Sequence, residues 1–456
     1  MTTAPASLPR PSALLGDDFF EGFLASRSEP SWLTERRRAA FTAAKSLPWP
    51  TLRDEEWRRT DIRAFKPEAF VGVTPGTPSD TVRAEVEAAV NELRGHYGLG
   101  IARTNAGTPV RVGEADLGGA VFLDLETAVR EHGDLLEKRL STSIVDPAAD
   151  VLSALHAAYW TTGVFLYVPK GVRVETPLFS LVASAGEGVL DLDHTIVIVE
   201  EEGEASLVRE LRSFGREGRA GLHLGAVELA VADRAKLQFV DLQAWDDATW
   251  HFSRERAEIS AGGSIQWTVG ALGSRLSKVN QEVALTGERA QAQVNGVIFA
   301  TGRRHLAYFT RQDHQAPHTT SDLLYKGGLN DASRVVWKGM IRVEKDAQRT
   351  DAYQKNDSLI LSEAARADSI PGLEIEANDV RCTHGATAGP VDEEMVFYLQ
   401  ARGIDRETAV RLIVEGFFAN VYDRISLEPV RETLRRAVAE KLELGGSSNS
   451  SPTSEA

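Results

Sequence analysis

Short corners recur at nearly fixed intervals through the second half of the chain, and each leads into a run with the alternating pattern of a β-strand. The corners at Ala332, Ala347, Ala365 and Val380 follow one another at nearly equal spacing. Earlier corners, at Ala205, Ala235, Ser264 and Ala290, are spaced more widely, which fits either one longer turn or two short ones. Stacked coils of a parallel β-helix place equivalent corners above one another, with strands roughly 4.8 Å apart. This register predicts a parallel β-helix, because an antiparallel sandwich does not require it.

The strand-like pattern occupies the middle of the chain, with helical patterns on both sides. We expect a largely helical N-terminal region over residues 1–160, a β-helix core over 161–390 and a C-terminal helical region over 391–444. Helices are predicted at residues 17–25, 30–45, 81–93, 126–139, 148–160, 392–402, 406–421 and 426–444. The tail over 445–456 is rich in Gly, Ser, Asn and Pro and is expected to be disordered. The sequence therefore predicts a mainly β protein with helical regions at both ends.

Acidic residues outnumber basic residues in this chain. Asp and Glu together number 66 and Lys and Arg 51, which gives a formal net charge of −15. A general nucleic-acid binder needs a basic surface, so this balance argues against nucleic acid as a partner. No stretch approaches the roughly 18 to 20 apolar residues of a membrane span, and the N-terminus lacks the apolar core of a signal peptide. We expect a cytoplasmic protein with no membrane contact.

Cys382 is the only cysteine in the 456 residues. A single thiol excludes an internal disulfide and any metal cluster held by several thiolates of one chain. A bound cluster would need ligands from a partner chain. We therefore expect no cofactor in the isolated protein.

Local signatures of catalysis are missing from the sequence. It has no phosphate-binding loop ending in Gly-Lys-Ser/Thr, no nucleophile elbow and no zincin His-Glu pair, so we assign no catalytic residue and expect a protein that is not an enzyme. Acidic residues near the corners leave open a carbohydrate-processing β-helix enzyme, which would use carboxylates in a cleft. These residues are Asp331, Asp346, Asp357, Asp368 and Asp379. The preferred interpretation is turn chemistry, because Asp at corners satisfies local backbone groups.

Cys382 and His384 are the most distinctive pair of side chains. On a strand they share one face with Val380, because side chains alternate with a period of two. In one interpretation the face points inward, Cys382 is a small buried hydrophobe and His384 caps the strand end. In the other, the pair lies at the last coil, faces a partner and offers a soft sulfur and an imidazole to iron. The residue pattern alone favours the first.

The helix predicted at residues 406–421 has an apolar stripe that includes Ile413 and Phe417. Most of this stripe is expected to be core. Because only three short helices follow the β-helix, they cannot easily cover both Phe417 and Phe418. We expect an exposed apolar surface for a partner among Ile413, Phe417 and Phe418.

Several segments resemble the SufB/SufD family of iron-sulfur cluster assembly proteins. The segments are residues 350–356, 361–368, 373–375 and 379–387, followed by 392–394, 397–399 and 402–404, with 54–58 and 163–171 upstream. Within this family the chain is more similar to the SufD branch, since its Cys-Thr-His-Gly-Ala-Thr segment is similar to the form in that branch. The SufB branch has a scaffold cysteine on the preceding strand, and residues 364–367 contain no thiol here.

This resemblance implies a right-handed parallel β-helix that acts in a complex with a SufB-type paralogue and a SufC-type ABC ATPase. It implies that His384 takes part in cluster assembly, with Cys382 as a second candidate ligand and a transient iron-sulfur cluster in the complex. It also implies that the ATPase contacts the C-terminal helical region. A cluster scaffold of the SufB kind is the alternative within the family. A homodimer and a role for flavin are left open.

Overall fold

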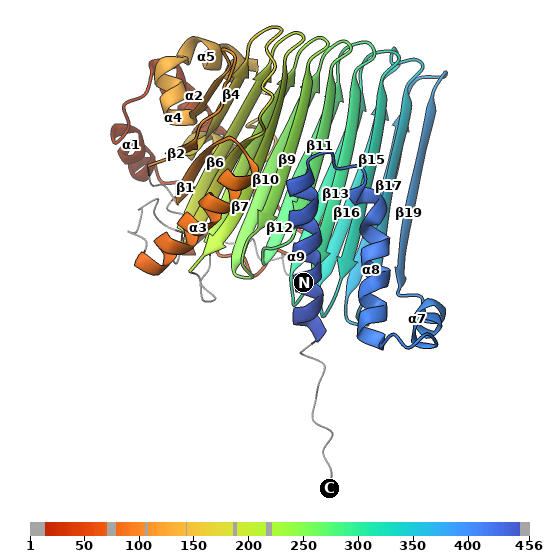
Figure 1. The fold of residues 1–456 in the computed structure, drawn as a ribbon. Helices are drawn as coiled ribbons and strands as arrows, with labels where there is room; N and C mark the ends of the chain where they lie inside the picture. Colours follow the sequence, from red (N-terminus) through yellow and green to blue (C-terminus); the bar gives the residue numbers. More distant parts are fainter. Residues whose placement is uncertain are drawn as a thin grey trace, which may run out of the picture.

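The computed structural model describes residues 14–70, 79–104, 108–142, 144–185, 189–215 and 221–446. Within these residues the chain forms a flattened solenoid whose successive strands alternate between two long sheets (Figure 1). The first sheet contains, in spatial order, β19 (Arg381–Pro390), β17 (Asp351–Ile360), β15 (Thr320–Leu329), β13 (Gln291–Ala300), β11 (Ser264–Ala271), β9 (Lys236–Ala244), β7 (Glu204–Phe214), β5 (Leu178–Ala185), β1 (Leu99–Thr104) and β2 (Val110–Gly113). The second contains β18 (Arg366–Ile375), β16 (Arg334–Val343), β14 (His305–His314), β12 (Leu276–Leu285), β10 (Thr249–Ile259), β8 (Gly221–Val231), β6 (Val189–Val199), β4 (Thr162–Val168) and β3 (Val121–Asp124).

Each complete coil of the solenoid contributes one strand to each sheet. Ser264 pairs with Gln291, and Gln291 pairs with Thr320, so equivalent positions recur at a nearly constant interval along the chain. The corners at Ala332 and Ala365 precede β16 and β18, whereas those at Ala347 and Val380 precede β17 and β19. The predicted parallel stacking is therefore confirmed. The short intervals between the late corners are half-coils on alternate edges, and the longer upstream intervals are whole coils.

The interior of the solenoid is built from side chains that stack in register from coil to coil. One such row contains Leu207, Phe239, Trp267, Val294 and Leu323, each on a different strand of the first sheet. All five are at most 1% exposed. The rings of Phe239 and Trp267 meet edge to face at 5.6 Å. Parallel pairing in register puts equal side-chain faces above one another, which is why a row stays inside over many coils.

Helices cover the outer faces of both sheets. Helices α1 (Asp17–Ala25), α2 (Ser31–Ser46), α4 (Leu125–Glu131), α5 (Gly133–Thr142) and α6 (Val151–Tyr159) pack with the second sheet, next to the short η1 turn (Pro67–Ala69). Helices α3 (Asp80–His96), α8 (Arg406–Tyr422) and α9 (Glu428–Gly446) pack on the first sheet, and α7 (Glu393–Gln400) lies near β19 (Figure 1). Arg436 of α9 is 2.6 Å from Glu92 of α3, so the last helix meets a helix of the N-terminal region on one face.

The structure differs from the sequence-based expectation in three places. Strands β1, β2 and β3 lie in the region expected to be largely helical, and β1 and β3 pair with the first strands of the solenoid. The helix expected at 126–139 is two helices, which meet at His132 and Gly133. Helix α9 extends to Gly446, and the rest of the tail expected to be disordered lies outside the described residues. In the part of the chain that the structure describes, no helix is long and apolar enough to cross a membrane.

Replacing Trp267 with Ala should strongly destabilise the fold. The side chain is fully buried in the middle of the stack, and removal of a buried Trp costs about 3 to 5 kcal/mol. The measurement is the midpoint of thermal unfolding. Phe397→Ala is the control, because this side chain is 71% exposed and its loss should change the unfolding free energy by less than about 0.5 kcal/mol. Equal midpoints for the two variants would contradict the assigned packing.

Candidate functional site

The two ends of the solenoid are covered differently. At the N-terminal end, β2 and β3 pair antiparallel with their neighbours, and helices pack around them. At the other end, β18 and β19 each pair with a neighbour on one side only. Within the described residues nothing continues either sheet beyond them, and β19 forms the outer edge of the solenoid in Figure 1. We call the surface formed by β18 and β19 the open end.

Side chains that belong to interior rows become accessible at the open end. Ile341 and Val343 are fully buried, yet Leu373 and Ile375, which lie above them in register, are 37% and 40% exposed. The difference has one cause: no further coil among the described residues covers β18. Unpaired strand edges and an uncovered apolar core section are the features of a surface that another sheet can extend.

His384 lies on the last strand of the interior row that contains Trp267 and Leu323. It pairs in register with Gln354, which is fully buried and donates to the carbonyl of Gly372 at 3.0 Å. His384 itself is exposed, and it has no hydrogen bond to another described residue. The interpretation of His384 as a buried capping residue is therefore wrong, because the side chain is exposed and no strand of the described residues covers it. Its imidazole is available to a partner or a metal ion at the open end.

Cys382 shares this face but has a different environment. Its side chain is half-buried and packs with Val380 against a small cluster that includes Ile341 and Ala352. Burial raises the pKa of the Cys382 thiol, a hydrogen bond with the Ala352 backbone lowers it, and the Asp351 carboxylate raises it further, with a net increase. Metals bind the thiolate, so this environment makes Cys382 a poorer ligand than His384 in the free chain.

The donors at the open end do not amount to a complete metal site. No group of three or more His, Cys, Asp or Glu side chains able to hold a metal ion occurs among the described residues. A tetrahedral iron or cluster site takes about four donors. The pair Cys382 and His384 would therefore need ligands from a second chain.

The three apolar residues expected to form a partner surface have different positions. Phe418 is fully buried, stacks on Tyr422 and faces Phe299 of the first sheet. Ile413 and Phe417 are half-buried. Lys326 lies 4.3 Å from the centre of the Phe417 ring and donates to the Phe417 carbonyl. Phe418 therefore cannot contact a partner, because α8 uses it to pack against the sheet.

Exposed apolar side chains occur instead on α7 and in the first half of the neighbouring α8. Phe397 is 71% exposed, Tyr398 54% and Met395 50%, and Leu412 of α8 is 42% exposed. We call these four residues the α7 patch. Sequence analysis missed it because a short helix with apolar residues on several sides gives little periodicity.

The acidic corner residues do not form a catalytic cleft. Asp331 accepts a hydrogen bond from the Gly302 amide at 2.7 Å, and Asp368 binds Arg334 at 2.7 Å. Asp379 lies 3.5 Å from Arg349. These three carboxylates thus bind backbone groups or basic side chains at separate coils. A carbohydrate-processing enzyme needs two carboxylates close together in a cleft, so this arrangement does not favour one.

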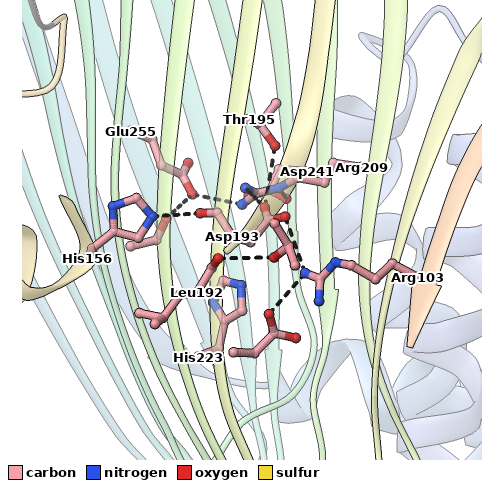
Figure 2. A network of polar contacts seen from close by, with 12 residues as sticks. Arg103, His156, Leu192, Asp193, Thr195, Arg209, His223, Asp241 and Glu255 are labelled. Carbon is pink, nitrogen blue, oxygen red and sulfur yellow. Dashed lines mark hydrogen bonds and ion pairs between the residues drawn. The ribbon is translucent and has the colours of Figure 1, made fainter. Parts of the chain in front are cut away.

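A buried network of charged side chains fills the solenoid where β6, β7, β9 and β10 face each other (Figure 2). The Arg209 guanidinium is fully buried and contacts Asp241 at 2.9 Å, Asp193 at 3.3 Å and Glu255 at 3.4 Å. Arg103 lies 2.9 Å from Asp191 and 3.5 Å from Asp193. Burial and the Asp241 carboxylate raise the pKa of Glu255 above its usual range, which reduces the excess of negative charge around two guanidiniums.

Several histidines lie in or beside the solenoid interior in their neutral form. The Nδ1 atoms of His223 and His251 are 2.9 Å apart, and both nitrogens of His314 bind hydroxyls, of Thr319 at 2.7 Å and Ser321 at 2.8 Å. Burial lowers the pKa of His251 to about 3 and that of His314 to about 4. Burial also lowers the pKa of His305 to about 4. These groups are structural, and they make the fold sensitive to acid.

Comparisons with known proteins identify the family. The model of the SufBD core domain of the SUF system of iron-sulfur cluster assembly matches residues 181–417, and the model of the SufBD N-terminal region matches residues 21–179. The chain therefore belongs to the SufBD family of iron-sulfur cluster assembly proteins.

The chain is similar to individual members over most of its length. It is 27% identical to the iron-sulfur cluster assembly protein SufD of Bacillus subtilis over 432 residues, which is 93% of this chain and 97% of the relative. It is 31% identical to a SufBD family protein of Mycobacterium tuberculosis over 403 residues, 87% of this chain and 90% of the relative. The chain is thus a homologue of SufD.

Acid should destabilise this protein well before its carboxylates titrate. Unfolded His binds a proton near pH 6.5, whereas buried His251, His305 and His314 bind one only near pH 3 to 4. Between these values the unfolded state holds more protons, so the free energy of unfolding falls as pH falls, by about 2 kcal/mol per histidine at pH 5. Buried Glu255 and Glu210 act in the opposite direction, because a raised pKa lets the folded state keep a proton. They are two groups against five histidines, since burial also lowers the pKa of His156 and His223.

The measurement is chemical unfolding at pH 7 and pH 5, for the wild type and for His251→Gln. The wild type should be markedly less stable at pH 5. The variant should lose less stability between the two pH values, since one proton-linked group has been removed. Identical losses would show that His251 titrates normally in the folded state.

Proposed function

We propose that this protein is a non-catalytic subunit of a cytoplasmic iron-sulfur cluster assembly complex. In this proposal the open end pairs with a SufB-type paralogue, the α7 patch contacts a SufC-type ABC ATPase, and His384 assists the entry of iron into the nascent cluster. The observation that carries the proposal is the position of His384, exposed at the end of an interior row. Iron and the cluster are cargo here, and the isolated chain is expected to hold neither.

The geometry of the open end supports pairing with another β-helix. Strands β18 and β19 are equally long, and both present unpaired backbone groups on the same side. A second solenoid could continue both sheets and cover Leu373 and Ile375. A chain of the same family has strands of matching spacing, whereas an unrelated globular partner would leave many backbone groups unpaired.

Replacing Ile375 with Asp should abolish pairing with the paralogue and leave the fold intact. The side chain is already 40% exposed, so a carboxylate there costs little in the free chain but would be buried without a partner in the paired state. The measurement is co-purification of the two co-expressed chains. Val110→Asp is the matched control, because Val110 is 59% exposed on an edge strand at the other end of the solenoid. Normal pairing of Ile375→Asp would refute the role of the open end.

The same experiment addresses the homodimer. If the purified chain alone is dimeric and Ile375→Asp makes it monomeric, the open end joins two copies when the paralogue is absent. If the chain alone is monomeric, the pairing is specific to the paralogue.

His384→Ala should lower cluster formation in the assembled complex without loosening it. His384 makes no hydrogen bond within the described residues, so its loss leaves no buried group unsatisfied and should change the unfolding midpoint little. The measurement is cluster yield by absorption, together with the unfolding midpoint of the same preparation. Thr383→Ala is the control, since this exposed neighbour faces the opposite side of β19. Normal cluster yield in His384→Ala would remove the functional role.

The α7 patch is the proposed contact for the ATPase. Four large apolar side chains of α7 and the neighbouring α8 are exposed, and Phe397 is the most exposed of them. We propose this patch in place of the three residues expected from the sequence, because Phe418 is buried. The other two, Ile413 and Phe417, are half-buried on the neighbouring helix α8.

Phe397→Asp should prevent binding of the ATPase while pairing with the paralogue continues. A buried carboxylate at an apolar contact would lower the affinity by at least about 100-fold. The measurement is co-purification of all three co-expressed chains, with Val110→Asp again as the control. Ile375→Asp should give the reverse pattern, with the ATPase retained and the paralogue lost. If Phe397→Asp retained the ATPase, the docking surface would lie elsewhere.

A further inference from the structure

A pocket of about 340 Å³ lies between two N-terminal helices and the outer face of the second sheet. Helices α2 and α6 form one wall, and strands β6, β8, β10 and β12 form the other. No residue of β18, β19 or α7 lines it. The pocket is therefore distinct from the open end and from the α7 patch.

Small side chains on both walls create this space. Ala39, Ala40 and Ala43 line it from α2, and Ala226 lines it from β8. Larger apolar side chains close it, among them Trp57, Trp160, Phe252, Leu33, Leu152 and Leu224. A cavity of this size, mostly apolar with a few polar groups, has the character of a site for a small organic molecule.

Lys278 supplies a buried cation at one end of the pocket. Its side chain is 3% exposed, and no carboxylate of the described residues lies within ion-pair distance of its ammonium. Its hydrogen bond goes to the Asn280 side-chain oxygen at 3.2 Å, and the ammonium lies 3.7 Å from the centre of the Phe309 ring and 4.9 Å from that of Trp57. An ammonium has three donors, so this site has capacity for an anion. Burial lowers the pKa of Lys278 to about 7, and the Glu56 and Asp150 carboxylates offset this only in part, so an anion bound beside the amine would stabilise its protonated form.

The neighbouring arginine is already neutralised. Arg254 lies 2.7 Å from Asp150 and donates to the Ser153 hydroxyl at 3.2 Å. Asp150 caps the first turn of α6, and Ser153 lies within that turn. An incoming anion would therefore be bound by Lys278 rather than by Arg254.

His194 supplies an unused polar atom at the other end. Its Nε2 is 3.1 Å from the Glu228 carboxylate, whose second oxygen accepts from the Ile144 amide at 3.1 Å. Its Nδ1 is buried and has no hydrogen-bond partner among the described residues. In the neutral ring, with Nε2 donating to Glu228, Nδ1 is an acceptor. It can receive a hydroxyl or amino group of a ligand.

The sheet fixes the separation of these two ends. His194, Ala226, Arg254 and Asn280 form one row across β6, β8, β10 and β12. Lys278 precedes Asn280 on the same face of β12. Three strand spacings correspond to about 14 Å. A ligand that uses both ends must be elongated, with an apolar middle.

We propose that this pocket binds an elongated organic anion whose acid group pairs with Lys278, whose apolar body lies between the α2 alanines and Phe252, and whose far end donates a hydrogen bond to His194. The ligand class is a carboxylic acid with a flat aromatic or aliphatic body and a terminal hydroxyl or amine. The proposal is independent of the role assigned to the open end.

The test uses three compounds with one rigid body. A hydroxybiphenyl carboxylate with its two polar groups at opposite ends carries all the proposed features. Biphenyl carboxylate lacks the hydroxyl, and hydroxybiphenyl lacks the acid. Calorimetric titration of the full-length protein should show one site for the first compound, about threefold to tenfold weaker binding without the hydroxyl, and at least tenfold weaker binding without the acid.

Two variants place the binding in this pocket. Lys278→Met keeps a long buried side chain without the charge. It should lower the affinity for the full compound to that of the wild type for hydroxybiphenyl. Ala43→Phe should block binding by filling the space from α2. Lys345→Met is the control, since Lys345 is exposed and outside the pocket, and it should bind like the wild type. Unfolding midpoints of all variants show whether each is folded.

The outcomes decide the proposal in each case. Loss of affinity in folded Lys278→Met together with the stated order of the three compounds supports it. Equal affinity for all three compounds would mean nonspecific binding to apolar surface, such as the α7 patch, and would overturn it. Absence of binding by the full compound at millimolar concentration, or unchanged affinity in Lys278→Met, would also overturn it.

Discussion

The in-register hydrogen-bond ladder between coils is the constraint on which the rest of the structure depends. Each strand from β4 to β17 has its backbone paired on both sides, and each coil supplies the partner of the next. A ladder of this kind has an edge strand at each end, whose unpaired backbone groups must be covered or must pair with another chain. Antiparallel strands and helices close the first end. At the second end no described residue pairs with the outer edges of β18 and β19, and the lack of a further described coil also exposes His384, Leu373 and Ile375. The chemistry proposed for this protein thus arises where the repetition of the fold stops.

The interior of the solenoid shows that an interior row need not be apolar. Arg209 and Asp241 occupy the same row as Val269 and Tyr325, one coil after another, and stay there because they neutralise each other in place. Removing one partner would leave a buried charge, which is far more costly than exchanging both for apolar residues. Replacing one charged member of the network alone should therefore destabilise the fold more than replacing both members of a pair.

The sequence predicted the features that follow from the spacing of residues along the chain. It left open the features that depend on contacts between segments far apart in the sequence. Corner spacing indicated stacked coils, and the helix expected at 17–25 coincides with α1. The same spacing could not tell whole coils from half-coils, because it contains no information on which sheet a strand joins. Strand parity placed Cys382 and His384 on one face, but their different exposure depends on the corner that packs over Cys382 and on the coil missing above His384. The burial of Phe418 and the buried charged network were missed for a similar reason. Phe418 is buried because α8 packs on Phe299 of the first sheet, and the network joins strands of different coils.

The packing of the C-terminal helices along the first sheet bears on how such a structure can unfold. A solenoid whose coils contact only their neighbours behaves as a one-dimensional array and can unravel from a free end, one repeat at a time. Here α8 packs on β13 and β15, Arg424 binds Asp322 of β15 at 3.1 Å, and α9 continues to α3 near the first coils. The C-terminal helices thus span the array from its late coils to its early ones. Helices that join late and early coils in this way favour unfolding as one cooperative unit over unravelling from one end.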